Sequence, residues 1–391
     1  MSWKKNFARF LGAAPKRLHF AAHSHHPWPD VSFDAHQQAW LDAAREADHK
    51  WDRVFSELIP RAQAHVARQL SLPDPATVCF APSTHEFIVR LLSALPISSN
   101  GGPVRVLTTD SEFHSFSRQM KRLEEERRAV VERVPVAPFE SFAQRFCAAA
   151  ARGGHHLVYF SQCFYNTGFR IADFEALVNA VPDRETCIVI DGYHSFMAMP
   201  TDLSRIAHRV FYTAGGYKYA MAGEGACFLH CPPGYALRPV NTGWFASFGT
   251  LTQAQAHDEV PYAVGGQRFM GATFDPAPLY RFNAVQDWLA REGITVAMIR
   301  AHVENLQRRF LDWREKSGAF PGAELLPPAG TDRGNFLIFC SPQAPDWYAQ
   351  LAALDVLTDL RDDRLRIGFG LYHEDSDLDA LCERTGLVRK R

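Results

Sequence analysis

A single lysine stands in an unusual setting in the middle of the chain. Lys218 lies in the segment TAGGYKYAMAGEGACFLH (213–230), with a tyrosine on each side and glycines and an apolar run around it. Lysine is normally a solvated surface residue. Burial lowers its basicity, and the neutral amine is a nucleophile that can form a Schiff base with a carbonyl compound. The segment therefore predicts that Lys218 is a Schiff-base lysine.

A carboxylate and an imidazole precede this lysine. Asp191 and His194 stand three positions apart after the apolar run TCIVI, and one further apolar run separates them from Lys218. Here Asp191 could hold a protonated ring nitrogen of a cofactor, and His194 could stack on the ring or position it. The structural alternative is a turn in which Asp191 caps the end of a strand.

Two further segments carry binding groups. Ser83 and Thr84 precede an apolar-periodic stretch, which places them at a helix N-terminus, where free N–H groups and the helix dipole bind phosphate. Ser83 with Glu86 also fits a capping box, which needs no ligand, and both uses share the same helix end. Phe113 follows a predicted strand and could stack on a flat ring, with a core phenylalanine as the alternative.

An arginine lies inside a late apolar segment, RLRIGFG (364–370). Arginine is unusual within a buried strand unless it is paired. The planar guanidinium of Arg366 suits a carboxylate with two parallel hydrogen bonds. A substrate carboxylate and a structural aspartate are both consistent with this position.

The elements that must position these residues alternate between about residues 75 and 230. Short apolar, β-branched segments alternate there with helix-like amphipathic segments such as 113–130. The predicted strands are 104–110, 155–162, 186–195, 209–215 and 225–230. This alternation is typical of an α/β fold with a mainly parallel sheet, in which ligands bind at the carboxyl ends of the strands.

The last third of the chain has a different pattern. Helices are predicted at 277–291, 293–313, 346–355 and 376–386, and strands at 335–340, 356–361 and 364–370. This pattern indicates a smaller α+β unit. We expect a large domain of residues 51–290, a small domain of residues 291–391, and an N-terminal segment of residues 1–50 that packs on the small domain or along the cleft.

Composition narrows the classes of function. The 391 residues are 47% apolar and 22% charged with a net charge of −1, so a general nucleic-acid or membrane-surface binder is not expected. No apolar run approaches the roughly 18 residues of a membrane span, and the N-terminus is a poor signal peptide. The eight cysteines are scattered without a CxxC pair, which favours a cytoplasmic protein with reduced thiols.

The order of these motifs resembles the class V group of fold-type I pyridoxal 5'-phosphate (PLP) enzymes, and within it most closely the kynureninases. The likeness spans roughly residues 20–385. The segments that carry it are YFSQCFYNTGFRI (159–171), GGYKYAMAGEGACFLH (215–230), NTGWFASF (241–248), GGQRFMGATFDPAP (265–278) and RLRIGFGLYHEDSDLD (364–379). It implies a large PLP-binding domain with a mainly parallel sheet, a smaller α+β C-terminal domain and a homodimer with its PLP sites near the subunit interface.

The resemblance also implies a role for each site residue. Lys218 would form the Schiff base with PLP and move the Cα proton of the substrate. Asp191 would keep the pyridine nitrogen protonated, so that the ring withdraws electrons, and His194 would support both. The other implied roles are ring stacking by Phe113, phosphate binding by Ser83, Thr84 and Tyr217, phosphate contacts from the second subunit by Trp244 and Thr273, and binding of the substrate α-carboxylate by Arg366.

The N-terminal segment AAHSHHPWP (21–29) departs from the family, which has an Asn-Ser-Leu-Gly run here. Ser24 is retained and is a predicted substrate-binding residue. The segment also carries three histidines: His23, His25 and His26. No carboxylate or cysteine is spaced to complete a metal site with them, so we expect no metal there. They would reshape the substrate pocket or lie in a loop.

These features predict a cytoplasmic, homodimeric PLP enzyme that acts on an L-α-amino acid, with kynureninase-like hydrolysis of L-kynurenine to anthranilate and alanine as the first choice. The family's Tyr-Thr-Gly becomes Asn166-Thr167-Gly168, which leaves the substrate open. A class V aminotransferase or lyase reaction on another amino acid is the alternative. Cysteine desulfurase chemistry is disfavoured, because the segment 355–368 before and around the late arginine has no cysteine. A non-catalytic PLP-binding regulator is the third candidate, and the near-neutral charge argues against it.

Overall fold

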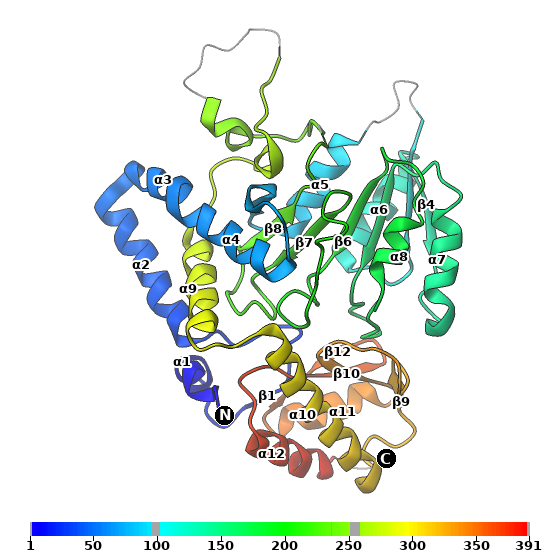
Figure 1. Cartoon of the computed structure of the whole chain (residues 1–391). Helices are drawn as coiled ribbons and strands as arrows, with labels where there is room; N and C mark the ends of the chain where they lie inside the picture. The colour runs from blue at the N-terminus through cyan, green and yellow to red at the C-terminus, as the bar shows by residue number, and fades with distance from the viewer. Residues whose placement is uncertain (1, 96–101, 236, 251–258, 389–391) are drawn as a thin grey trace.

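The computed structural model describes residues 2–95, 102–235, 237–250 and 259–388 (Figure 1). Its larger lobe is built around a seven-stranded sheet with the order β2-β8-β7-β6-β5-β3-β4. The strands are β2 (Val78–Ala81), β3 (Val104–Thr109), β4 (Ala129–Val134), β5 (Leu157–Ser161), β6 (Cys187–Asp191), β7 (Phe211–Gly215) and β8 (Cys227–His230).

Five neighbouring strands, β4, β3, β5, β6 and β7, run parallel, whereas β8 is antiparallel to both β7 and β2. Helices cover both faces of this sheet, so strands such as β5 are buried along their whole length and read as continuous apolar runs. The predicted α/β fold with a mainly parallel sheet is confirmed. The prediction was wrong for 113–130, because helix α6 (His114–Glu125) ends early and the following residues begin β4.

The helices of the large lobe complete its core. Besides α6, those of six or more residues are α2 (Asp30–Glu46), α4 (Ile59–Leu70), α5 (Thr84–Ala94), α7 (Phe142–Ala150), α8 (Phe174–Asn179) and α9 (Ala277–Arg291), and the shorter ones are α1 (Ala8–Gly12) and α3 (Lys50–Arg53). Helix α2 packs along α9, and α4 packs on both α9 and β2 (Figure 1). Among the described residues, no helix is long and apolar enough to cross a membrane.

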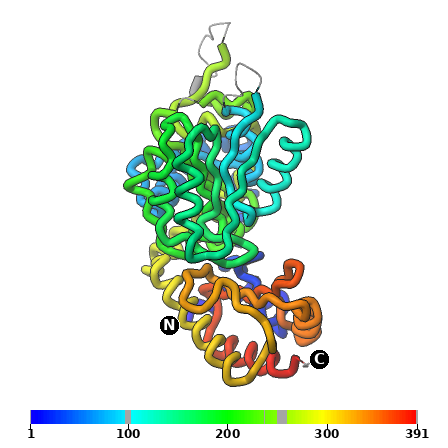
Figure 2. Tube along the Cα trace, turned by 90° about the vertical axis from the view of Figure 1, so that its right-hand side faces the viewer, coloured from blue at the N-terminus to red at the C-terminus, as the bar shows by residue number. Residues whose placement is uncertain are grey.

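The smaller lobe lies below the large one and has its own sheet, with the order β12-β13-β10-β9 (Figure 2). Its strands are antiparallel: β9 (Glu324–Leu326), β10 (Phe336–Cys340), β12 (Asp359–Arg361) and β13 (Arg364–Gly368). Its helices are α10 (Val296–Ser317), α11 (Ala344–Ala353) and α12 (Asp375–Gly386). Most helices and strands predicted for this part of the chain are confirmed to within a few residues. The predicted strand 356–361 was wrong, because it is divided into β11 (Val356–Leu357) and β12, which lie in different sheets, and β9 was not predicted.

The N-terminal segment touches both lobes. Strand β1 (Leu18–His19) pairs in parallel with β11 (Val356–Leu357), and Ala21 bridges to Gly368 at the end of β13. Phe20 belongs to the core of the small lobe, whereas Phe7 belongs to the core of the large lobe. The change from one core to the other falls within α10, because Ile299 belongs to the core of the large lobe and Val303 to that of the small lobe. The domain limits 1–50, 51–290 and 291–391 stay a prediction.

Candidate active site

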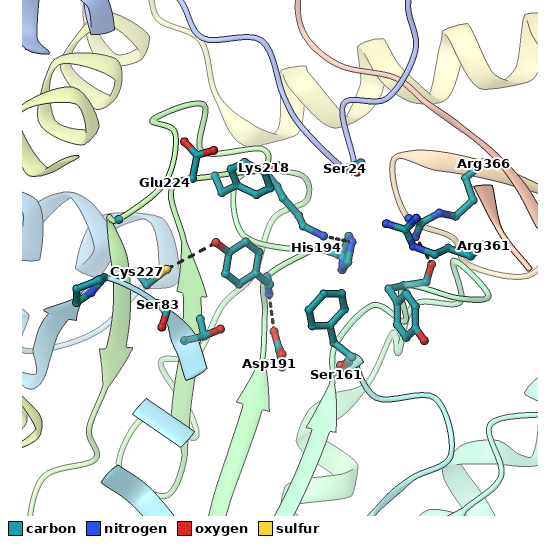
Figure 3. A pocket seen from close by; sticks show the side chains of 17 residues that line it. Ser24, Ser83, Ser161, Asp191, His194, Lys218, Glu224, Cys227, Arg361 and Arg366 are labelled. Carbon is teal, nitrogen blue, oxygen red and sulfur yellow. Dashed lines mark hydrogen bonds between the residues drawn. The ribbon is translucent and has the colours of Figure 1, made fainter. Parts of the chain in front are cut away.

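A cavity of about 400 Å³ lies at the carboxyl ends of β5, β6 and β7 and is closed by residues of the small lobe (Figure 3). Nine of the predicted site residues line it: Ser24, Ser83, Thr84, Phe113, Asp191, His194, Tyr217, Lys218 and Arg366. These residues come from parts of the chain that are far apart in sequence. The topology therefore brings most of the predicted site together in one chain.

Lys218 follows β7 and points into the cavity toward His194, whose Nε2 contacts the lysine Nζ (Figure 3). The ring centroids of Phe113 and Tyr193 lie 5.8 Å and 5.6 Å from Nζ. Desolvation by the surrounding protein, together with the positive charge of Arg366, lowers the pKa of Lys218 to about 7. A substantial fraction of the amine is therefore neutral near pH 7, as a Schiff-base nucleophile requires.

The turns around Lys218 depend on the small size of two glycines. A Cβ atom on Gly215 would lie 2.6 Å from Cys227 Sγ. Gly223 has a φ of +71°, and a Cβ atom there would meet the Trp28 ring at 2.5 Å. The glycine-rich sequence around the lysine is therefore explained by close packing on both sides of it.

Asp191 is the last residue of β6, and its carboxylate is fixed by two hydrogen bonds. Tyr159 donates its hydroxyl to Oδ2 at 2.8 Å, and the backbone N–H of Tyr193 donates to Oδ1 at 2.9 Å. Burial raises the pKa of Asp191, although both hydrogen bonds act in the opposite direction. A cationic ring nitrogen at this place would stabilise the ionised carboxylate, so the site fits the pyridine end of PLP.

The other side of the cavity is the N-terminus of α5. Ser83 caps this helix, because its Oγ accepts a hydrogen bond from the backbone N–H of Glu86 at 3.3 Å. Thr84 is the first residue of the helix, and Tyr217 lies opposite in the same cavity. Capping and anion binding are compatible, since the helix end also offers free N–H groups and a positive dipole. This side fits the phosphate of PLP.

Arg366 lies in β13 with only 3% of its surface exposed. It forms an ion pair with Asp359, and its Nη1 donates to the backbone oxygen of Tyr165 at 2.7 Å. Arg361 lies beside it (Figure 3) and forms a second ion pair with Asp359, with Nη1 2.9 Å from Oδ1. Asp359 is thus the structural aspartate that the sequence suggested as a partner of Arg366. The guanidinium also lines the cavity, so it is placed to meet a substrate as well.

Asp359 also faces a histidine of the N-terminal segment. His23 is fully buried, stacks on Phe336 with ring centroids 4.7 Å apart, and places Nε2 3.5 Å from Asp359 Oδ2. Burial and the nearby Arg366 lower the pKa of His23 to about 3. Burial alone would raise the pKa of Asp359, but His23 and Arg366 hold it well below its usual range. His23 therefore supports the arginine pair from behind as a neutral ring.

The other histidines of this segment have separate environments. His26 is buried, and its Nδ1 lies 2.7 Å from the backbone oxygen of Pro27. The ring of His25 stacks with Trp28 and meets Tyr217 edge-on at 5.2 Å. Among the residues that the structure describes, no group of three histidine, cysteine or acidic residues could hold a metal ion. Ser24 is the one residue of the segment 21–29 that lines the cavity.

Trp244 and Thr273 do not line the cavity of their own chain. Trp244 stands at the start of η6 (Trp244–Thr250), packs on Phe245 with ring centroids 4.3 Å apart, and remains 45% exposed. Thr273 is also exposed. Their predicted contact with the phosphate of a second subunit stays a prediction.

Sequence reasoning missed several residues of the cavity. Tyr165 lies one position before Asn166, so the site keeps a tyrosine near the place where the family's motif is changed. The position of Arg361, five residues before Arg366, could have indicated it. Whether its side chain faces the cavity depends, however, on how the β12–β13 hairpin folds. The other unpredicted lining residues are Pro82, Ser161, Tyr193, Glu224, Gly225 and Cys227.

Comparisons with known proteins agree with this fold. The chain is similar to the apo cysteine desulfurase of Thermococcus onnurineus NA1, with a TM-score of 0.82, 14% identity, and coverage of 99% of this chain and 98% of that chain. It is also similar to C-DES. A variant of C-DES with glycine covalently linked to the PLP cofactor gives a TM-score of 0.78, 17% identity, and coverage of 98% and 99%. The structure of the cystine C-S lyase C-DES with its reaction product cysteine persulfide gives a TM-score of 0.79 and 17% identity, and the match covers 97% of this chain and 99% of that chain.

Residues 30–319 match the protein-family model described as Aminotransferase class-V, and a search of curated proteins finds no match. The chain therefore belongs to the class V aminotransferase family, and its predicted fold type and PLP cofactor are confirmed. The closer resemblance to kynureninases is not confirmed, since the structures named above are a desulfurase and a C-S lyase.

Proposed function

From membership of the class V aminotransferase family, we propose that the protein cleaves a bond at the β-carbon of an L-α-amino acid by a lyase-type elimination. One observation carries the proposal: a single cavity holds an amine with a pKa of about 7, a buried carboxylate and a buried guanidinium, those of Lys218, Asp191 and Arg366. When bound, PLP supplies a protonated ring that accepts negative charge from the substrate Cα.

Lys218 is placed to move the Cα proton. The lysine amine lies next to His194 in the cavity and would be available to the Cα proton of a substrate held on PLP. Its lowered pKa leaves it able to accept a proton near neutral pH, as a general base must. Asp191, which is oriented by hydrogen bonds from Tyr159 and the backbone of Tyr193, would hold the ring nitrogen in its cationic form.

The arginine pair is placed to orient the substrate. Arg361 and Arg366 share one carboxylate, Asp359, and His23 behind it is neutral. One positive charge is therefore left over on this side of the cavity, which matches one substrate α-carboxylate. Because Asp359 and the Tyr165 backbone hold Arg366, its position is set before substrate arrives.

Elimination balances without a cysteine nucleophile. Lys218 takes the Cα proton, the Cβ–S bond of the substrate breaks, and the sulfur leaves with the electron pair. With water, an S-substituted cysteine then yields pyruvate, ammonium and a thiol, and cystine yields cysteine persulfide in place of the thiol. The turn between β12 and β13 consists of Asp362 and Asp363 and carries no cysteine of its own, although Cys340 of β10 lies against it with Sγ 3.4 Å from Asp363 Oδ2. The neighbour described as a cystine C-S lyase supports this choice.

A kynureninase-like hydrolysis is the second candidate, favoured by the aromatic side of the cavity. Phe113 and Tyr165 both line it and meet edge-on, with ring centroids 5.4 Å apart. Such a pair suits an aryl-keto side chain. In that reaction water cleaves the Cβ–Cγ bond and releases an aryl acid and alanine.

One assay separates the candidates. The purified, PLP-loaded protein is incubated with L-cystine and, separately, with L-kynurenine, and the products are identified by mass spectrometry. Pyruvate with cysteine persulfide from cystine is the expected result. Anthranilate with alanine from kynurenine would replace the first proposal by the second. Conversion of the cofactor to its pyridoxamine form with neither product set would overturn both and indicate an aminotransferase. The Lys218→Ala variant is the control for uncatalysed breakdown.

We also propose the homodimer, with Trp244 and Thr273 of each chain near the phosphate of the other. Trp244 is exposed and does not line the cavity of its own chain, which supports this arrangement. Trp244→Ala should weaken PLP binding measured by equilibrium dialysis, and light scattering should give twice the chain mass. A chain that is monomeric while it binds PLP fully would overturn the arrangement.

A further inference from the structure

A second buried carboxyl lies behind the active-site aspartate. Glu112, in the turn after β3, is 3% exposed, and its Oε2 lies 2.5 Å from Ser161 Oγ. Ser161 ends β5, lines the cavity, and is the ladder partner of Asp191 in β6. No step of the proposed reaction uses Glu112, so its place beside the cavity needs another explanation.

The hydrogen bonds of Glu112 fix where its proton must lie. Oε1 accepts two hydrogen bonds, from Thr109 Oγ1 at 2.7 Å and from the backbone N–H of Ser161 at 3.2 Å. Oε2 meets only the hydroxyl of Ser161 in the described contacts. A neutral Glu112 therefore carries its proton on Oε2 and donates it to Ser161 Oγ. An ionised Glu112 requires the reverse, with Ser161 donating its own hydrogen.

The surroundings favour the neutral form. In the described part of the chain, the titratable groups that face Glu112 from neighbouring strands are Asp191 of β6 and Tyr159 of β5. Burial raises the pKa of Glu112 to about 8, and the charge of Asp191 raises it as well, while the bonds from Ser161 and Thr109 oppose the rise. Two buried carboxyls in such proximity disfavour simultaneous ionisation.

We propose that Glu112 is a positioning residue that donates its proton to Ser161 Oγ and so leaves the Ser161 hydroxyl hydrogen free to donate to a polar atom of the bound cofactor. When Glu112 ionises, that hydrogen turns back to Oε2 and the cavity loses a donor. The inference rests on the presence of PLP in the cavity and is independent of which amino acid is cleaved.

The test is PLP binding by equilibrium dialysis across the pH range around the Glu112 pKa of about 8, in a Lys218→Ala background. This background removes titration of the lysine and all turnover. Affinity of the parent should fall as pH rises through this range, because the Ser161 donor is lost. Glu112→Gln should keep the neutral-pH affinity and lose this part of the fall, since its amide donates to Ser161 at every pH. Ser161→Ala should bind PLP about fivefold more weakly at neutral pH, the effect of one lost hydrogen bond.

The control is Glu125→Gln at the end of α6, whose side chain is 67% exposed and which should leave the binding curve unchanged. Thermal unfolding of each variant without PLP shows that it is folded. An unchanged alkaline fall in Glu112→Gln, or parental affinity in Ser161→Ala, would overturn the inference. Because no substrate is added, a wrong assignment of the substrate leaves this result intact.

Discussion

The two ends of the cavity are built in different ways. The lysine end, defined here as Asp191, His194 and Lys218, comes from one continuous stretch around β6 and β7. The arginine end, defined as His23, Asp359, Arg361 and Arg366, joins the N-terminal segment to the β12–β13 hairpin. The lysine end, which would hold the cofactor, is therefore set by local strand-end geometry. The arginine end, which would hold the substrate, is set by long-range packing.

The geometry of the arginine end depends on close packing between segments that are distant in the sequence. Gly368 pairs with Ala21, and its backbone lies against the ring of His23. The lysine end instead uses carboxyl ends of adjacent parallel strands, which meet at one edge in any such sheet. Variants at the lysine end should therefore abolish chemistry, while variants at the arginine end should alter substrate binding and stability.

The largest effect is expected for Lys218→Ala. Loss of the base and nucleophile should reduce turnover about 10⁴-fold, the upper range for a general base. The visible absorbance of the bound cofactor should also shift, because its covalent bond to the chain is gone. Steady-state kinetics and the absorbance spectrum measure both, and Lys218→Arg is the control that retains the positive charge. Full turnover in Lys218→Ala would show that another residue is the base, and the proposed difference between the two ends would then be wrong.

Arg366→Ala should act on substrate binding. Loss of a buried, charged contact with the substrate α-carboxylate should cost about 2–5 kcal/mol, seen mainly as a raised KM. Arg361→Gln should cost less, because the Arg361 side chain is 41% exposed. PLP affinity, measured separately, should change little in either variant. An unchanged KM in Arg366→Ala would show that Arg366 does not bind the substrate and serves only as the ion-pair partner of Asp359.

Gly368→Ala tests the packing between the hairpin and the N-terminal segment. The added Cβ atom would lie 2.1 Å from His23 Nδ1 and 3.0 Å from the backbone nitrogen of His23. We expect a loss of about 1–3 kcal/mol in the free energy of unfolding, the usual cost of overpacking, together with a raised KM. Gly12→Ala is the matched control, because no atom lies within 4 Å of its Cβ position. Equal stability of the two variants in urea would show that the segment adjusts freely.

The smallest effect concerns pH. Burial lowers the pKa of His23 to about 3 and that of His26 to about 4, from 6.5. The unfolded chain therefore binds more protons below pH 6.5, so stability is full above that value and falls as pH drops toward the folded pKa values. Each histidine should contribute about 1.4 kcal/mol per pH unit below 6.5.

Urea unfolding at pH 6.5 and about one unit lower measures this slope. His23→Gln should flatten it by the contribution of one group, whereas His49→Gln, whose ring is 91% exposed, should not. The same slope in His23→Gln and the parent would mean that His23 takes up its proton without leaving its buried position. That result would mean that the arginine end does not contribute to the loss of stability at acid pH.

The sequence alone predicted the lysine end and five strands of the large sheet, β3, β5, β6, β7 and β8, because both follow local rules, whereas β2 and β4 were not predicted. Buried strands read as apolar β-branched runs, and polar residues after them, such as Asp191, must lie at the ligand-binding edge. The glycine-flanked Lys218 carried its own chemical signal. The error at 113–130 arose because charged residues after α6 continue an amphipathic pattern while the chain already turns into β4.

Only the tertiary structure decided which distant groups meet. Nothing local links His23 to Asp359 or puts Glu112 behind Ser161. The first contact depends on how the N-terminal segment packs on the small lobe, and the second on the pairing of β3 with β5 in the large sheet. Arg361 and Arg366 meet because the β12–β13 hairpin sets them side by side. Spacing along the chain specifies neighbours within a helix or strand, whereas burial and charge pairing between elements act only after the chain has folded.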